Sequence, residues 1–141
     1  MQIGIDLGAT KIESVLLDSE GSELHRSRKE SPQNYKDTIA SITESVNLIE
    51  KKFKKKFNVG VCHPGSTNID SGLIQNANNS PWLNNMSFTN DISINLNRKV
   101  LCENDANCFS LSESFDGAAK HYKVVFGIIL GSGCGGGLVV D

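Results

Sequence analysis

Two glycine-rich segments, each placed between apolar runs, lie far apart in this chain. The later one, Gly131-Ser-Gly-Cys-Gly-Gly-Gly137, follows the apolar run 124–130 and precedes Leu138-Val-Val140. The earlier one, Asp6-Leu-Gly-Ala-Thr-Lys11, also lies between β-prone runs. Glycine permits positive φ and lets backbone N–H groups approach an anion, so each segment predicts either a plain hairpin turn or a phosphate-contacting turn. The pair therefore predicts a strand, a turn and a returning strand in both places.

The later segment superficially matches a dinucleotide-binding pattern. Gly131, Gly133 and Gly136 have G-x-G-x-x-G spacing, but that pattern requires a helix directly after the glycines, whereas a β-prone run follows here. No G-K-[ST] sequence is present for a Walker loop. We therefore expect a hairpin turn in which the backbone at Gly131 and Gly133 and the Ser132 hydroxyl donate hydrogen bonds to phosphate oxygens.

Between the two segments the sequence predicts alternating strands and helices. Apolar side chains at Ile39, Ile42, Val46 and Ile49 recur at intervals of three and four residues, which predicts an amphipathic helix over 34–55. The other predicted elements are strands 2–5, 12–17 and 22–28 as an antiparallel meander, strand 58–62, an irregular stretch 68–90, helix 91–96, strand 100–102 and helix 106–115. This order predicts an α/β fold with a mixed sheet flanked by helices.

Composition narrows the class of protein. The chain has 141 residues and a net charge of −2, which predicts neither a broad nucleic-acid surface nor a membrane surface. The basic run 51–56 is expected to be a solvated helix end. Four cysteines without C-x-x-C spacing predict no zinc site within this chain. The sequence enters a strand pattern at Met1 without a signal-peptide pattern, so we expect a cytoplasmic protein with reduced thiols.

The polar groups of the earlier loop suit a metal–polyphosphate complex. Asp6 follows the first predicted strand, and its carboxylate is suited to holding a hydrated Mg²⁺. Gly8 provides the turn, and Thr10 and Lys11 bring a hydroxyl and an ammonium group. The alternative is that Asp6 only stabilises its own hairpin turn.

Asn104 and Asp105 lie between a predicted strand end and a helix start. In that position an aspartate either caps the helix or acts as a general base that accepts a proton from a substrate hydroxyl. Both roles use the same carboxylate oxygens, and the sequence leaves them open.

Three further residues carry weaker signals. His63 is expected to be packed or hydrogen-bonded rather than catalytic, and Cys108 to be a small core residue. Asn78, with its neighbouring asparagines, either binds a polyol or builds turns. Trp82 and Leu83 predict that the irregular stretch is ordered, because they need apolar neighbours.

Five blocks of sequence form one pattern along the chain. They are Ile3-Gly-Ile-Asp-Leu-Gly-Ala-Thr-Lys-Ile-Glu13, Pro64-Gly-Ser66, Asn76-Ala-Asn78 with Trp82-Leu-Asn84, Glu103-Asn-Asp-Ala-Asn107 and Leu130-Gly-Ser-Gly-Cys-Gly-Gly136. Taken together, the five blocks resemble the repressor, open reading frame, kinase (ROK) family of sugar kinases. The third block looks most like the bacterial fructokinase/mannokinase branch, with the N-acetylglucosamine kinase branch close behind.

The resemblance implies an actin-like ATPase fold of two ribonuclease H-like lobes, with MgATP and a hexose between them. Residues 1–120 would form the N-terminal lobe and 121–141 the opening β-hairpin of a truncated second lobe. Zinc is expected only in the second half of such proteins, which this sequence does not contain.

The resemblance also implies a reaction and its residues. ATP would phosphorylate the 6-hydroxyl of a hexose to give hexose 6-phosphate and ADP, with Asp105 as the general base. The expected hexose is fructose or mannose. Sugar-binding residues would be Pro64, Gly65, Asn78, Asn104 and Asp105. Phosphate-binding residues would be Gly8, Thr10, Lys11, Gly131, Ser132 and Gly133, with Mg²⁺ held at Asp6 through water.

Other readings stay open beside the hexose kinase. N-acetylglucosamine or glucose is an alternative substrate, and a noncatalytic fragment that binds a nucleotide or a partner is the main rival function. A sugar-sensing repressor is disfavoured, because such repressors carry a DNA-binding segment before the first strand, whereas this sequence starts at Met1 directly with the predicted strand. We expect the chain alone to have little kinase activity. We also expect it to expose apolar surface over Val124–Val140, which favours self-association. Assembly as a homodimer stays open.

Overall fold

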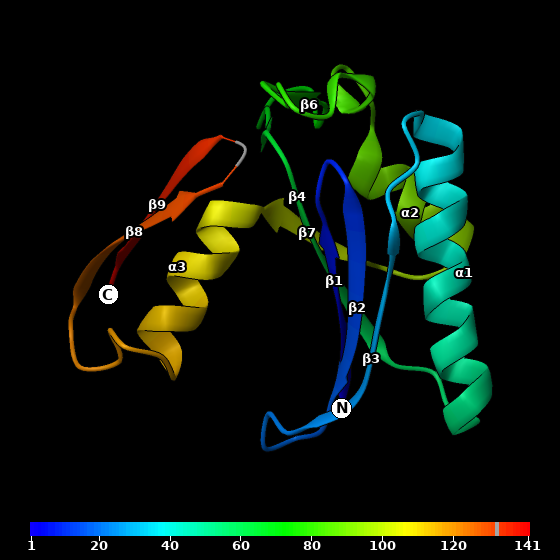
Figure 1. The fold of residues 1–141 in the computed structure, drawn as a ribbon, viewed down its shortest axis with the longest axis horizontal. Coiled ribbons are helices and arrows are strands. Elements are labelled where there is room, and N and C mark those ends of the chain that lie inside the picture. The colour runs from blue at the N-terminus through cyan, green and yellow to red at the C-terminus, as the bar shows by residue number, and fades with distance from the viewer. Residues whose placement is uncertain (132) are drawn as a thin grey trace.

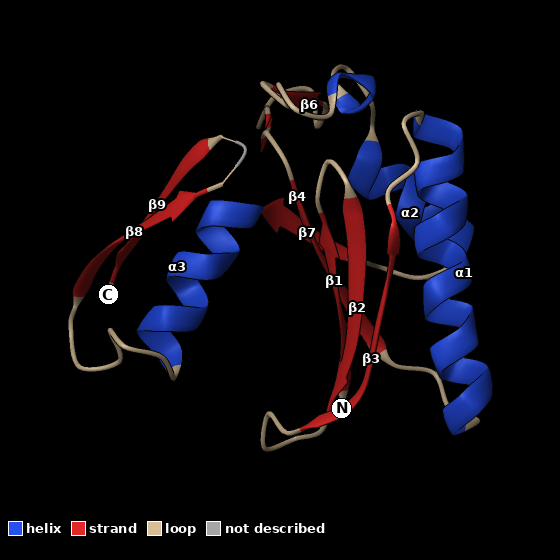
Figure 2. Cartoon of the chain, in the orientation of Figure 1, coloured by secondary structure: helices blue, strands red, loops and turns tan. Residues whose placement is uncertain are grey.

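A five-stranded mixed sheet lies at the centre of the computed structural model, which describes residues 1–131 and 133–141 (Figures 1 and 2). Its strands, in spatial order, are β3 (Glu23–Glu30), β2 (Lys11–Leu17), β1 (Gln2–Leu7), β4 (Asn58–His63) and β7 (Leu101–Asn104). β1, β2 and β3 form the predicted antiparallel meander, whereas β4 and β7 run parallel to β1. The predicted mixed α/β sheet is confirmed.

Helices lie on both sides of this sheet. Figure 1 shows α1 (Tyr35–Phe53) and α2 (Phe88–Leu96) on one side and α3 (Asp105–Phe115) on the other. α1 begins where the Asn34 side chain accepts a hydrogen bond from Asp37 N–H at 2.9 Å, and it ends at Lys54 in the left-handed conformation. The apolar face of α1 packs on β1, β2 and β4 to form the core.

The stretch predicted to be irregular is ordered. β5 (Ser66–Thr67) pairs with β6 (Ile74–Gln75), and a 3₁₀ turn, Pro81–Leu83, follows. Leu83 is fully buried and Trp82 packs against the core, as predicted. Helix α2 starts at Phe88, three residues earlier than expected, because the buried Phe88 side chain joins its apolar face.

A β-hairpin formed by β8 (Val124–Leu130) and β9 (Cys134–Val140) packs against α3. β9 starts earlier than the predicted strand 138–140, since the glycines before Leu138 continue the ladder. The outer face of the hairpin exposes apolar side chains, and Phe126 keeps 66% of its surface accessible. The predicted exposed apolar surface is confirmed, and self-association through it stays a prediction.

A buried carboxylate ties the end of α1 to the segment after α2. Glu50 accepts hydrogen bonds from Arg98 Nη1 at 2.6 Å, Lys56 Nζ at 2.8 Å and the Phe57 N–H at 3.0 Å. Burial alone would raise the pKa of Glu50, but these hydrogen bonds outweigh it and lower the pKa to about 2.

In the described part of the chain, no helix is both long and apolar enough to cross a membrane.

Replacing Glu50 by glutamine should destabilise the fold at neutral pH by about 3 kcal/mol, because the Arg98 side chain, only 19% exposed, then loses its charge partner. The folded-state pKa of about 2 lies below the ordinary value of 4.5. The stabilisation is therefore complete above pH 4.5, and it disappears as the pH falls toward 2. Thermal melts of wild type and Glu50→Gln across this range test the prediction.

Glu44→Gln is the matched control, since Glu44 forms only a surface pair with Lys29 at 3.2 Å. Its effect should stay within about 0.5 kcal/mol. Equal effects of the two substitutions at neutral pH, or a Glu50 effect that does not change with pH, would contradict the assignment.

Gly65 turns the chain from β4 into β5 with a φ of 80°. A methyl group there would lie 2.5 Å from the Gln75 carbonyl oxygen and 2.9 Å from the Ala77 nitrogen. Gly72 also has a positive φ, of 71°, but open space around it. Gly65→Ala should therefore cost about 3 kcal/mol and Gly72→Ala about 1 kcal/mol, as measured by denaturant unfolding. A Gly72 variant as unstable as the Gly65 variant would show that crowding is not the cause.

Candidate active site

One row of polar residues crosses all five strands of the sheet. In spatial order the row is Arg28, Glu13, Asp6, Cys62 and Glu103, each directly opposite the next in the strand register. Residues opposite one another on neighbouring strands point to the same face. Ile5 and Leu7, which flank Asp6, are buried in the core, so the polar row lies on the other face, which carries α3.

The carboxyl ends of three parallel strands gather most of the predicted sugar-binding and catalytic residues. β1 reaches Asp6 near its end, β4 leads into Pro64 and Gly65, and β7 ends at Asn104. Ligands of open α/β sheets bind outside the carboxyl ends of parallel strands. The arrangement brings these residues to one edge of the sheet, and their roles stay predictions.

The Asn104 side chain connects this edge. Its Nδ2 donates to the Gly65 carbonyl oxygen at 2.7 Å and to Asp105 Oδ1 at 2.9 Å. Its Oδ1 accepts from the N–H groups of Ala106 at 3.0 Å and Asn107 at 3.1 Å. Asn104 is therefore the N-cap of α3, and it also orients the neighbouring carboxylate.

Asp105 is the first residue of α3 rather than its N-cap. Its Oδ1 accepts from the Ala106 N–H at 2.8 Å and from Asn104. The capping alternative for Asp105 is thus corrected: Asn104 provides the cap. The Asp105 carboxylate lies at the positive end of the helix dipole, where a negative charge is stabilised.

Asp6 lies in a field of negative charge. The Asp6 side chain is exposed, yet the surrounding protein atoms partly desolvate it and raise its pKa. The carboxylates of Asp105 and Glu13 raise the pKa further, while Arg28 acts in the opposite direction. A divalent cation relieves such repulsion, so the chemistry of the site fits Mg²⁺. In the residues that the structure describes, no cluster of three or more His, Cys, Asp or Glu side chains could hold a metal. Water and phosphate would therefore supply most of the ligands.

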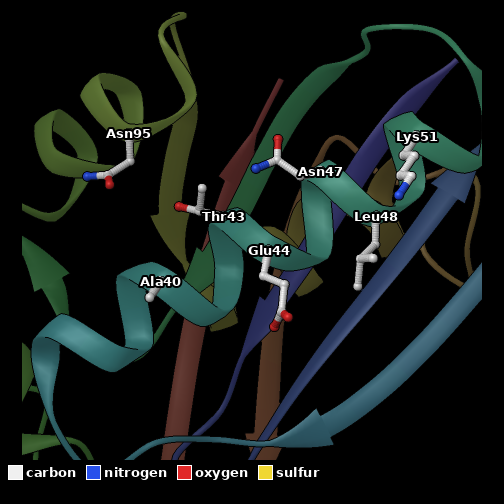
Figure 3. Close-up of a pocket in the computed structure, with 7 residues that line it drawn as sticks. All are labelled: Ala40, Thr43, Glu44, Asn47, Leu48, Lys51 and Asn95. Atoms are coloured by element: carbon white, nitrogen blue, oxygen red, sulfur yellow. The ribbon is translucent and has the colours of Figure 1, made fainter.

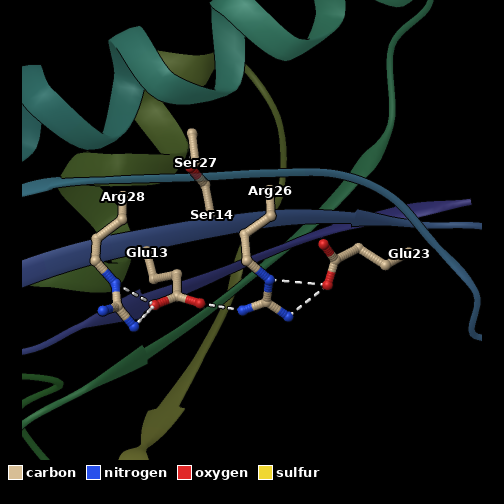
Figure 4. A network of polar contacts seen from close by, with 6 residues as sticks. All are labelled: Glu13, Ser14, Glu23, Arg26, Ser27 and Arg28. Carbon is tan, nitrogen blue, oxygen red and sulfur yellow. Dashed lines mark hydrogen bonds and ion pairs between the residues drawn. The ribbon is translucent and has the colours of Figure 1, made fainter.

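Glu13 is clamped between two arginines of β3, as Figure 4 shows. Arg28 Nε donates to Glu13 Oε2 at 2.7 Å, and Arg26 pairs with the other oxygen of Glu13 and with Glu23. Hydrogen bonds from Arg28 and Arg26 lower the pKa of Glu13. Glu13 and Arg28 were not singled out from the sequence, because only the strand register places them beside Asp6.

The two glycine turns lie at the same end of the molecule, where β1 and β4 finish (Figure 1). In the first turn, Gly8 N–H donates to the Lys11 carbonyl oxygen at 2.9 Å, and the Thr10 carbonyl oxygen accepts from Ser31 N–H. Lys11, exposed, begins β2.

The second turn lies between β8 and β9. Gly131 N–H donates to the Gly133 carbonyl oxygen at 2.9 Å, and Ser132 lies outside the described residues. A methyl group on Gly133 would be 3.1 Å from Asn79 Nδ2, so this turn lies against the loop that contains Asn78.

Two residues with weaker sequence signals are now placed. His63 is fully buried, edge-on to Phe88, with its Nδ1 3.0 Å from the Pro64 carbonyl oxygen, so the predicted packing role is confirmed. Cys108 is half-buried and lies on the side of α3 that faces Cys62, and the interaction of the two thiols lowers the pKa of Cys108 and raises that of Cys62. The expectation that Cys108 is only a small core residue was incomplete, because β4 brings a second thiol to it.

A shallow hollow on the outside of α1 is lined by residues such as Thr43, Glu44 and Lys51, with Asn95 of α2 (Figure 3). None of the predicted site residues that the structure describes lines it. It is a surface hollow that is separate from the carboxyl edge of the sheet.

Sequence comparison finds sugar kinases. The chain is 38% identical over 142 residues to an N-acetyl-D-glucosamine kinase of Haemophilus influenzae, which covers all of this chain and 46% of the relative. It is 35% identical to an N-acetylgalactosamine kinase of a Shewanella species, with the same coverage. The chain thus spans about half the length of the curated relatives it matches.

Solved structures agree in fold. A ROK family glucokinase from Streptomyces griseus, in complex with glucose and AMPPNP, matches with a TM-score of 0.88 at 27% identity over 99% of this chain and 44% of that one. A polyphosphate/ATP-glucomannokinase from an Arthrobacter strain matches with a TM-score of 0.78 at 32% identity over 99% of this chain and 58% of that one. The expected fold class, an actin-like α/β lobe with a mixed sheet flanked by helices, is confirmed.

The five blocks, the carboxyl edge of the sheet and these similarities agree with a match to the ROK family that extends over residues 2–141. The chain belongs to the ROK family.

Proposed function

We propose that this chain is the base-bearing part of an ATP-dependent sugar kinase, with Asp105 as the general base. The observation that supports this most directly is the fixed carboxylate of Asp105. Its Oδ1 is held by Asn104 and by the Ala106 N–H, and no protein hydrogen bond to its Oδ2 is found among the described residues. A carboxylate held by one oxygen keeps the other for a substrate hydroxyl.

In the proposed reaction the sugar hydroxymethyl oxygen attacks the γ-phosphorus of ATP and its proton passes to Asp105. Phosphoryl transfer depends mainly on positioning and on stabilising charge spread over the phosphate oxygens. Mg²⁺, held at Asp6 through water, would neutralise part of that charge. Backbone N–H groups and side chains of the two glycine turns would contact the phosphates; these residues are Gly8, Thr10, Lys11, Gly131, Ser132 and Gly133.

The sugar would lie over the loop that follows β4. Pro64, Gly65 and Asn78 are the proposed substrate contacts, together with Asn104 and Asp105. Both amide hydrogens of Asn104 are already engaged, one on Gly65 and one on Asp105. We therefore give Asn104 two proposed roles: it orients the base, and it shares its amide with a sugar hydroxyl when the substrate is bound.

N-acetyl-D-glucosamine is the preferred substrate in this proposal. The motifs alone favoured fructose or mannose, but the relatives that match the entire chain at 34–39% identity include several N-acetyl-D-glucosamine kinases. Glucose and N-acetylgalactosamine follow as alternatives. The division of the chain into a lobe over 1–120 and the first hairpin of a second lobe over 121–141 is also proposed, and under it the isolated chain has little activity of its own.

Asp105→Asn should lower turnover by about 1,000-fold, because general-base catalysis commonly contributes that much. A coupled assay of ADP release measures it in the full-length product of the gene, because the 141-residue chain alone is expected to have little activity. Asp116→Asn, at the other end of α3, is the matched control and should leave turnover unchanged. An Asp105 variant that retains normal turnover and normal melting would rule out the proposed base.

A substrate panel separates the branches of the family. We expect kcat/KM to be about tenfold or more higher for N-acetyl-D-glucosamine than for fructose, because a site that binds the acetamido group loses those contacts with fructose. The panel includes mannose, glucose and N-acetylgalactosamine at matched concentrations. A higher kcat/KM for fructose or mannose would restore the branch that the motifs favoured.

A further inference from the structure

Two thiols from distant parts of the sequence meet beside the proposed base. Cys62 lies near the end of β4, next to Asp6 in the polar row. Cys108 lies in the first turn of α3, three residues after Asp105. α3 packs against β4. Ala106 and Ser110 of α3 contact the β8–β9 hairpin, so Cys108, on the opposite side of the helix, lies toward the face of the sheet that carries Cys62.

The other two cysteines are placed differently. Cys102 lies opposite Val61 in the register, packs against the apolar core and so belongs to the other face of the sheet. Cys134 is exposed at the start of β9. Cys62 and Cys108 are both half-buried, so a small reagent can reach them.

We propose that Cys62 and Cys108 form a reversible intramolecular disulfide when the protein meets a hydroperoxide. One sulfur attacks the peroxide and becomes a sulfenic acid, releasing one molecule of water or alcohol. The second sulfur then attacks the sulfenic sulfur, the S–S bond forms and a molecule of water leaves. The two sulfurs lose two electrons to the peroxide, and both thiol protons end in the released molecules.

The disulfide would have a mechanical consequence. A disulfide holds its two Cα atoms at a narrow range of distances, so it fixes the first turn of α3 to the end of β4. Asp105 lies in that same turn. In the kinase proposed above, on which this consequence rests, oxidation displaces the carboxylate and lowers turnover, and a dithiol reductant restores it.

The chemical test uses the double variant Cys102→Ser/Cys134→Ser, which keeps only the proposed pair. After hydrogen peroxide treatment, intact mass spectrometry should show a loss of two hydrogen atoms, and a peptide map should join Cys62 to Cys108. Dithiothreitol should reverse both changes. Adding Cys62→Ser to this variant should abolish the loss, leaving a single thiol that gains oxygen instead.

The mass readout requires neither ATP nor a sugar, so it stands apart from the proposed function. A folded double variant that stays reduced, gains oxygen without losing hydrogen, or links only between molecules overturns the disulfide. Thermal melting before oxidation confirms that each variant is folded. Where phosphorylation is measurable, unchanged turnover in a fully oxidised sample overturns the mechanical consequence while leaving the disulfide in place.

Discussion

Parallel pairing of β4 with β1 and β7 is the constraint on which the rest of this structure depends. The register places Asp6, Cys62 and Glu103 side by side, and it brings the loops that follow the three strands to one edge. A shift of one residue would turn Asp6 into the core and Ile5 out of it. Burial of Ile3, Ile5, Val59 and Val61 against α1 therefore sets the position of the polar row on the opposite face.

The carboxyl edge of the sheet combines a fixed hydrogen-bond network with repulsion between carboxylates. Asn104 links the loop after β4 to the start of α3, so the Gly65 turn and the Asp105 carboxylate are held by one side chain. Across the edge, Asp6 and Asp105 repel each other, and this repulsion helps to raise the pKa of Asp6. Repulsion between these two carboxylates destabilises the site when it is empty, and it favours the binding of a cation. The Glu50–Arg98 pair, on another part of the fold, contributes stability that does not depend on a ligand.

The sequence predicted what local patterns determine. Apolar periodicity located α1 and the meander, and strand ends located Asp6 and Asn104–Asp105. Long-range register could not be read in the same way, so the row from Arg28 to Glu103 and the thiol pair were missed. The sequence also could not show which residue caps α3. Both Asn104 and Asp105 are good N-cap residues, and only their hydrogen bonds identify Asn104 as the cap. Relatives, rather than motifs, shifted the preferred sugar.

Glycines of the later glycine-rich segment have two different structural roles. Gly131 and Gly133 bound the turn that faces the asparagine loop, where a phosphate-binding role is proposed. Gly137, by contrast, lies in β9 against α3, where a methyl group would collide with Ser110 Oγ and the Ala106 carbonyl oxygen. The Ser110 hydroxyl donates to the Gly137 carbonyl oxygen at 3.0 Å across this close approach. Glycine is thus required there for packing, which couples the position of the turn to α3, the helix that carries Asp105.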